Sequence, residues 1–369
     1  MDAMSETLTS KIPVTVLTGY LGAGKTTLLN RILSEDHGKT YAVIVNEFGE
    51  IGIDNDLIVG ADEEVFEMNN GCVCCTVRGD LIRIVQGLMK RKGGFDGIIV
   101  ETTGLADPGP VAQTFFVDED VKAKTRLDSV TTVVDAKHIT MRLTDSREAR
   151  EQIAFADQIV LNKTDLVDEH DLRMIEARLR KMNPLAPIHR AERSNVPLNL
   201  ILGRGGFDLD RIVELEPDFL NPAHGEPGHV HDEDCDDDHD HHAHGHDHGH
   251  DHDHHGHHHD HDHDHHDHVH DDDIKGYSLR LDQPVNGEKI SRWLNDLLAL
   301  QGPNILRAKG IIDVAGENRR LVFQAVHMIL EGDYQREWKA GEERYSRMVF
   351  IGRDLNEAQL KAGFAACVA

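Results

Sequence analysis

Residues 19–27 read Gly19-Tyr20-Leu21-Gly22-Ala23-Gly24-Lys25-Thr26-Thr27. This is the pattern G-x-x-x-x-G-K-T, in which backbone N–H groups surround a phosphate chain. A β-branched apolar run precedes it at residues 14–17, and apolar residues at helical spacing follow it at residues 28–33. A strand, a glycine-rich loop and a helix N-terminus in this order predict a nucleotide site, because partial positive charge there faces the phosphates.

The residues of this loop have distinct expected roles. We expect the nucleotide to be held by Gly19, Gly22, Ala23, Gly24, Lys25, Thr26 and Thr27. Lys25 should reach the β- and γ-phosphates and act as the catalytic cation, and the Thr26 hydroxyl should be a ligand of Mg²⁺. The alternative is a chance glycine-rich turn, and the flanking strand and helix patterns argue against it.

Apolar β-branched runs alternate with amphipathic segments over residues 12–200. They predict strands at 14–17, 41–46, 97–101, 130–135, 158–162 and 188–191, with helices between them. This alternation indicates an α/β fold, a P-loop NTPase parallel sheet with helices on both faces. Ligands of such sheets bind beyond the carboxyl ends of the strands, where the glycine-rich loop is expected.

Composition divides the 369 residues into four parts. We expect residues 1–11 to be a polar leader and residues 12–220 to be a P-loop nucleotide-hydrolysing domain. Residues 221–273 are a His/Asp-rich linker without apolar periodicity, which predicts disorder. Residues 274–369 predict a smaller α+β C-terminal domain. Its expected strands are 277–281, 305–314, 320–329 and 347–351, and its expected helices are 290–300 and 356–367.

The net charge of −27 is concentrated in the linker. Residues 221–273 hold 18 of the 66 acidic residues and none of the 39 Lys and Arg, so neither part has the basic face that nucleic acid needs. No apolar run approaches the roughly 18–20 residues that span a bilayer, and residues 1–11 lack a signal core. We therefore expect a cytoplasmic protein with no nucleic-acid or membrane partner, whose five cysteines stay reduced.

Asn162-Lys163-Thr164-Asp165 ends a predicted strand. This N-K-x-D pattern fits guanine, because the Asp165 carboxylate can accept hydrogen bonds from the ring N1–H and the exocyclic amine, whereas adenine would leave the charge unpaired. Lys163 can lay its stem over the base. A surface turn is the alternative, but the position at a strand end after a P-loop favours GTP.

Glu101 closes another apolar strand and is followed by Thr102-Thr103-Gly104. An acid at this place can hold Mg²⁺ together with Thr26, although most P-loop GTPases have Asp; the alternative is an acid that merely ends a strand. No residue after Gly104 corresponds to the glutamine that orients water in signalling GTPases, so we expect slow intrinsic hydrolysis.

Three thiols, Cys72, Cys74 and Cys75, lie within four residues on a predicted turn before a helix near Arg78. Thiolates are soft ligands that suit Zn²⁺, Co²⁺ or Cu⁺, and three of them leave a fourth position open, as metal transfer requires. Buried structural thiols are one alternative. A redox pair is another, since Cys72 and Cys75 have C-x-x-C spacing.

Asn46-Glu47-Phe48-Gly49 lies upstream of the thiols, in the region where P-loop proteins sense the γ-phosphate. Glu47 is a candidate fourth metal ligand. Asp54 is a candidate catalytic residue that positions Mg²⁺ or the attacking water. Solvated acids explain both residues equally well.

Residues 224–270 hold 22 of the 27 histidines. Alternating His and Asp can bind many divalent ions weakly, which favours a metal buffer or loading antenna over a merely solvating linker. The auxiliary metal ligands we single out are His231, His239, His241, His242, His244, His246, His248 and His250. Imidazole suits Zn, Ni, Co and Cu alike, so the tract does not specify its metal.

In this order, the segments G-Y-L-G-A-G-K-T-T, N-E-F-G-E, N-N-G-C-V-C-C-T, E-T-T-G-L-A-D-P and N-K-T-D resemble the CobW-type metallochaperone GTPases. That family is related to the nickel-inserting accessory GTPases of urease and hydrogenase. The resemblance covers nearly the whole chain, including residues 306–310 and 350–353. It implies GTP hydrolysis coupled to movement of a metal, commonly zinc and sometimes cobalt, from Cys72, Cys74 and Cys75 to a client enzyme.

The leading hypothesis is therefore a GTP-hydrolysing metallochaperone that uses Mg²⁺ and delivers Zn²⁺ or Co²⁺ to a client metalloprotein. Cobalt delivery to the cobaltochelatase of cobalamin biosynthesis is one alternative, and a His-rich zinc store is the other. A nucleotide- or metal-dependent homodimer is compatible with the pattern, but nothing in the sequence requires one.

Overall fold

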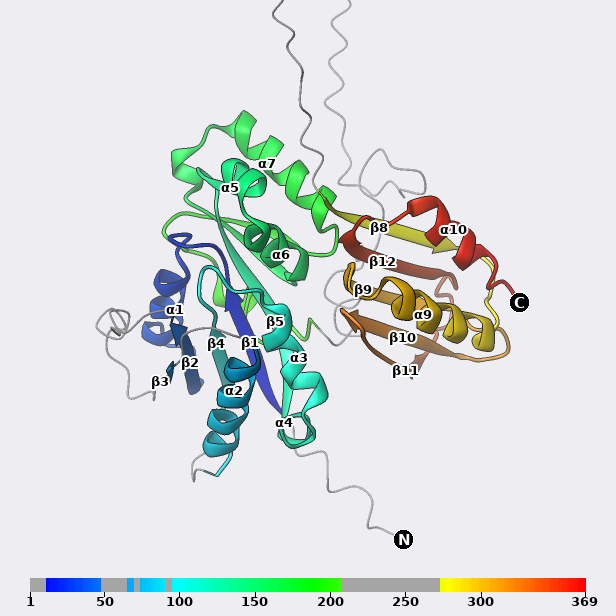
Figure 1. Ribbon diagram of the computed structural model, residues 1–369, viewed down its shortest axis with the longest axis horizontal. Helices are drawn as coiled ribbons and strands as arrows, with labels where there is room; N and C mark the ends of the chain where they lie inside the picture. The colour runs from blue at the N-terminus through cyan, green and yellow to red at the C-terminus, as the bar shows by residue number, and fades with distance from the viewer. Residues whose placement is uncertain (1–10, 48–64, 70–73, 91–94, 207–272) are drawn as a thin grey trace, which may run out of the picture.

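Two sheets, each covered by helices, lie side by side in the computed structural model (Figure 1). The structure describes residues 11–47, 65–69, 74–90, 95–206 and 273–369. Nearly all of the predicted leader and of the predicted linker lie outside these residues. No helix in the described part of the chain has the length and apolar character needed to cross a bilayer.

The first sheet has seven parallel strands within the described residues, in the order β3-β2-β4-β1-β5-β6-β7. The strands are β1 (Ile12–Thr18), β2 (Tyr41–Glu47), β3 (Val65–Asn69), β4 (Gly97–Glu101), β5 (Thr125–Asp135), β6 (Gln158–Asn162) and β7 (Ile188–Ala191). Every neighbouring pair is parallel. All the loops that follow these strands therefore leave from one edge of the sheet, with the loop after β1 at its centre.

Helices cover both faces of this sheet. They are α1 (Lys25–Ser34), α2 (Cys74–Leu88), α3 (Gly109–Val117), α4 (Glu119–Lys124), α5 (Ile139–Asp145), α6 (Arg147–Phe155) and α7 (Glu169–Met182), with short 3₁₀ turns at Thr164–Leu166 and Leu198–Leu200. On one face α1 buries Leu28, Leu29 and Ile32. On the other face α2, α3, α6 and α7 share a core with alternate residues of the central strands. The predicted α/β class is confirmed.

The second sheet is antiparallel, in the order β11-β10-β9-β12-β8. Its strands are β8 (Ile274–Leu281), β9 (Ile305–Ile312), β10 (Arg319–Val326), β11 (Ile329–Glu337) and β12 (Ser346–Arg353). One face packs against α9 (Gly287–Gln301) and α10 (Glu357–Ala365) through Leu294, Leu298 and Phe364. The other face contributes Ile311, Val322 and Val349 to the core of the first sheet, so the predicted α+β unit packs directly on the P-loop unit.

Three predictions about elements were wrong or incomplete. β3 was not predicted. The single strand expected at 320–329 is a hairpin, because the chain reverses at His327 and Met328, and Val326 pairs with Ile329. His327 makes the turn in the left-handed region with φ 51°, without the Gly or Asn that usually signals it. The helix expected near Arg78 begins at Cys74, so Cys74 and Cys75 belong to its first turn.

Candidate nucleotide and metal site

The glycine-rich loop joins β1 to α1, as predicted. Gly24 precedes α1 with φ 112°, a left-handed conformation that residues with a Cβ rarely adopt. A Cβ on Gly24 would lie 2.4 Å from Nδ2 of Asn162, so the backbone there is closely approached as well as left-handed. Lys25 is the first helical residue, and its Nζ donates to the Gly19 carbonyl at 2.8 Å. The ammonium is thus already held over the loop that is to receive the phosphates.

Thr26 and Glu101 meet across the sheet edge. The Thr26 hydroxyl donates to Oε1 of Glu101 at 3.3 Å, and Glu101 is 5% exposed. β4 lies beside β1, with Glu101 in register with Leu17, which brings the two side chains together from 75 positions apart. A hydroxyl and a carboxylate are hard oxygen ligands, which fits Mg²⁺. The predicted magnesium pair is therefore close in space, and its occupancy remains a prediction.

Asn162 anchors the phosphate loop, a role that the N-K-x-D pattern did not indicate. Its Nδ2 donates to the Ala23 carbonyl at 2.9 Å and to Oγ of Ser194 at 3.2 Å, and its Oδ1 accepts from the Ser194 N–H at 2.7 Å. Ser194 in turn donates to the Gly24 carbonyl at 3.0 Å. Asn162 is 2% exposed, so these bonds are shielded from water. The loop after β6 and the loop after β7 therefore hold the phosphate loop from behind.

Lys163 and Asp165 are placed at the same edge. Lys163 is left-handed with φ 63°, and its Nζ lies 2.6 Å from Oδ2 of Asp135, the last residue of β5. Burial alone would raise the pKa of Asp135, but hydrogen bonds from Lys163 and His138 outweigh it and lower the pKa. The resulting carboxylate fixes the lysine stem. Asp165 follows on the exposed turn Thr164–Leu166, where a base can reach it.

The structure describes only some of the residues that we predicted to bind metal. Glu47 is the last residue of β2 and is in register with Asn69, the last residue of β3, while Cys74 and Cys75 open α2 just beyond. The backbone thus brings Glu47 and these two cysteines to the same carboxyl edge as the phosphate loop. Asp54, Cys72 and the eight selected histidines lie outside the described residues. Among the described side chains no three His, Cys, Asp or Glu residues cluster as a metal site.

Sequence reasoning missed three residues that support this edge: Ser194, Asp135 and Gln152. Asp135 could have been found, because it ends a predicted strand as Glu101 does. Ser194 and Gln152 carried no comparable signal, since their partners lie 32 or more residues away and only packing brings them together.

The chain matches two known sequence families over most of its described length. Residues 13–190 match the family described as CobW/HypB/UreG, nucleotide-binding domain, and residues 274–368 match the cobalamin synthesis protein cobW C-terminal domain. A protein named Zinc chaperone YjiA, from Escherichia coli, is 34% identical over 359 residues, covering 96% of this chain and 98% of that one. The chain belongs to the CobW family.

Other CobW-family proteins are similar over comparable lengths. Zinc chaperone CobW from Pseudomonas aeruginosa is 35% identical, covering 95% of this chain and 90% of that one. The crystal structure of Zn(II)-bound YjiA GTPase superposes with a TM-score of 0.69 at 30% identity, covering 97% and 99% of the two chains. The resemblance inferred from the motifs and the two-part CobW fold are therefore confirmed.

Proposed function

We propose that this CobW-family chain is a zinc chaperone that binds and hydrolyses GTP and passes Zn²⁺ to a client metalloprotein. The observation that carries the proposal is the meeting of three predicted groups at one sheet edge: the Thr26–Glu101 pair, the guanine-reading Asp165 turn and the first turn of α2 with Cys74. Relatives named zinc chaperones, and a Zn(II)-bound GTPase structure, support zinc as the cargo.

In this proposal the chain's own residues divide the work. Backbone N–H groups of residues 22–26 and the N-terminus of α1 bind the phosphates, and Lys25 leaves the Gly19 carbonyl to neutralise the β- and γ-oxygens. Thr26 and Glu101 would hold Mg²⁺, which supplies charge neutralisation at the phosphates. Asp165 selects guanine, and Asp135 orients Lys163 beside it.

A cytoplasmic location stays a prediction.

The metal part is tested by a zinc titration of the full chain against a competing chelator, which hides weak sites in the His tract. Cys74→Ser should remove the tight site, while GTP binding persists. Cys367→Ala is the matched control, because Cys367 is a buried thiol in the C-terminal core, only 2% exposed. Zinc affinity that is equal in both variants would contradict the proposal.

The coupling part is tested in the same assay with a non-hydrolysable GTP analogue and with GDP. We expect the zinc affinity to differ between the two nucleotides, since Glu47 and α2 lie where a γ-phosphate can act on them. An affinity indifferent to nucleotide would remove GTP gating from the proposal. Repeating the titration with Co²⁺ decides between zinc and the cobalt-delivery alternative.

Zinc storage is the second candidate, favoured by the 22 histidines between residues 224 and 270. Deleting residues 229–270 separates the two functions. A store would lose nearly all of its metal capacity and its cellular role, whereas a chaperone would fail only when zinc is scarce.

A further inference from the structure

The loop that follows β4 lies directly on the phosphate loop. Thr102 donates its N–H to the Leu17 carbonyl at 2.9 Å and its hydroxyl to the Thr18 hydroxyl at 2.8 Å. Gly104 is so close that an added Cβ would lie 2.6 Å from the backbone nitrogen of Leu21. A backbone in this position faces the terminal phosphate of a bound nucleotide.

A buried glutamine holds this loop from the opposite side. Gln152 of α6 is 1% exposed, and its Nε2 donates to the carbonyls of both Gly104 and Ala106 at 3.1 Å. Both amide hydrogens are thereby used, one on each carbonyl. Gln152 also lines a cavity of about 150 Å³ together with Tyr20 and Leu21 of the phosphate loop.

The two bonds set the direction of the loop's N–H groups. All described peptide bonds are trans, so the N–H of Leu105 points away from the Gly104 carbonyl, and the N–H of Asp107 points away from the Ala106 carbonyl. Fixing both carbonyls toward α6 therefore directs both N–H groups away from α6. Without the glutamine, both peptide units lose the hydrogen bond that orients their carbonyls.

The helix that presents Gln152 is itself firmly held. Thr132 of β5 donates to the Gln152 carbonyl at 2.8 Å, and Asn183 donates to the Ile153 and Ala156 carbonyls at 2.8 and 2.9 Å. Glu151 pairs with Arg353 of the second sheet. α6 is thus a rigid support for the loop, tied both to the first sheet and to the C-terminal part.

We propose that Gln152 is a positioning residue for GTP hydrolysis: it holds residues 104–107 so that the N–H groups of Leu105 and Asp107 recognise the γ-phosphate. The inference rests on the proposed GTPase function and adds a residue through which the protein tells GTP from GDP. Gln152 does not touch the nucleotide; it acts through the backbone of the loop.

The test is Gln152→Met in the full chain, which keeps the side-chain length and removes the amide. We expect kcat for GTP to fall tenfold or more and the affinity for a GTP analogue to fall severalfold, with the GDP affinity within twofold of wild type. The matched control is Gln158→Met. Gln158 is also a buried glutamine, 5% exposed; it is the first residue of β6, at the end of the strand opposite Asn162, and it contacts His189 of β7. A loss of stability in both variants with unchanged nucleotide constants would overturn the proposal.

A second measurement covers the case in which Gln152→Met does not fold. In wild-type protein, amide hydrogen exchange at residues 104–107 should slow with the GTP analogue and not with GDP, and equal exchange would overturn the proposal. Lys25→Ala separates the two levels of inference. If Lys25→Ala abolishes GTP hydrolysis and Gln152→Met does not change it, only the role of Gln152 is refuted. If the wild-type protein does not hydrolyse GTP, or if Lys25→Ala leaves the rate unchanged, the GTPase function itself is refuted.

Discussion

The glycines of the phosphate loop are under different constraints although they share one motif. Gly22 has φ 73° with nothing within 4 Å of an added Cβ, whereas Gly24 has φ 112° and faces Asn162 and Ser194 at 2.4 and 2.9 Å. At Gly22 a side chain meets only backbone strain. At Gly24 it also pushes away the two residues that anchor the loop.

Gly24→Ala should therefore abolish tight nucleotide binding, while Gly22→Ala costs only about 1–2 kcal/mol of left-handed strain. The expected loss for Gly24→Ala is larger because Asn162 and Ser194 must move. GDP titration and urea unfolding of both variants measure the difference. Equal losses in the two variants would show that the contact with Asn162 is unimportant.

At the scale of elements, the hairpin of β10 and β11 packs the second sheet against the end of α6 and the start of α3. The ring of its turn residue His327 lies tilted against Phe155 of α6, with 5.1 Å between ring centroids. A Cβ added to Gly109 would lie 2.9 Å from Nε2 of His327. Burial is the main cause that lowers the pKa of His327; the charge of Glu151 opposes the shift, and those of Arg353 and Arg147 add to it. The histidine is therefore neutral in the folded protein at neutral pH.

This pKa has a consequence for stability. The unfolded chain binds a proton at His327 near pH 6.5, and the folded chain does so only at lower pH, so unfolding takes up a proton in that window. The free energy of unfolding should therefore fall as pH drops below about 6.5, and it should fall less in His327→Asn. Asn tolerates the left-handed turn, which makes it a fair replacement. Urea unfolding at a series of pH values measures both slopes, and parallel slopes would contradict the assignment.

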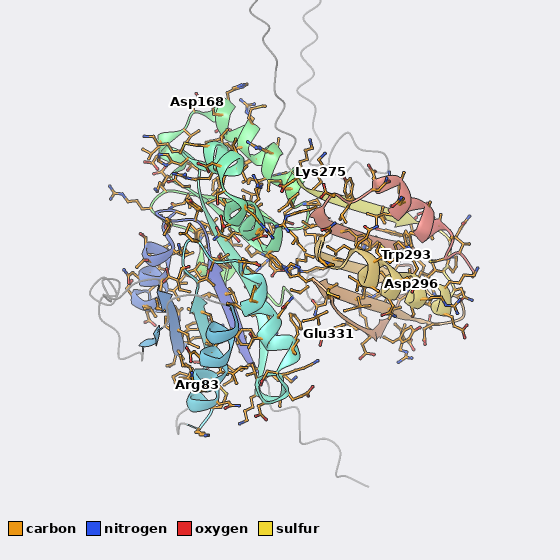
Figure 2. The ribbon with its side chains drawn as sticks, in the orientation of Figure 1. Arg83, Asp168, Lys275, Trp293, Asp296 and Glu331 are labelled. Carbon is orange, nitrogen blue, oxygen red and sulfur yellow. The ribbon has the colours of Figure 1, made fainter. Side chains whose placement is uncertain are left out.

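At the scale of the whole molecule, the two sheets are joined by buried charge as well as by apolar packing. Asp157, which precedes β6, pairs with Arg307 and Lys309 of β9, and all three side chains are at most 3% exposed. The second carboxylate oxygen of Asp157 accepts from the Val130 N–H at 2.9 Å. Nearer the surface, Lys122 of α4 pairs with Glu331 of β11, which Figure 2 places on the side of the second sheet that faces the first.

Removing this buried carboxylate should be costly. Asp157→Asn leaves two buried cations without its charge, and we expect a loss of about 3–5 kcal/mol in the free energy of unfolding. Glu169→Gln is the matched control, because it breaks an exposed pair with Arg190 and should leave the free energy of unfolding nearly unchanged. Chemical denaturation of both variants measures this. A small loss for Asp157→Asn would mean that the buried charge of Asp157 contributes little to the association of the two parts.

Local patterns were sufficient for the elements and motifs whose signals lie within a few residues. Three strands, at 97–101, 158–162 and 188–191, have the predicted bounds. The first two contain apolar runs that a polar residue closes, Glu101 in one and Asn162 in the other. The glycine-rich loop, the turn after Asn162 that we predict to bind guanine, and the CobW resemblance were likewise recognisable from contiguous residues. Glu101 was predicted near Thr26 because parallel strands end at one edge.

Contacts between distant segments were decided by packing and had no local signal. The turn at His327 has no Gly, Pro or Asn, so the hairpin emerges only when β10 and β11 pair. Ser194, Gln152 and the buried Asp157 pairs look like ordinary polar residues in the sequence, and their roles come from partners 32 to 170 positions away. The chemistry of the site is written in short motifs, whereas the supports that hold it in shape are set by sheet order and helix packing, because hydrogen bonds between distant residues form only after the chain has collapsed around its core.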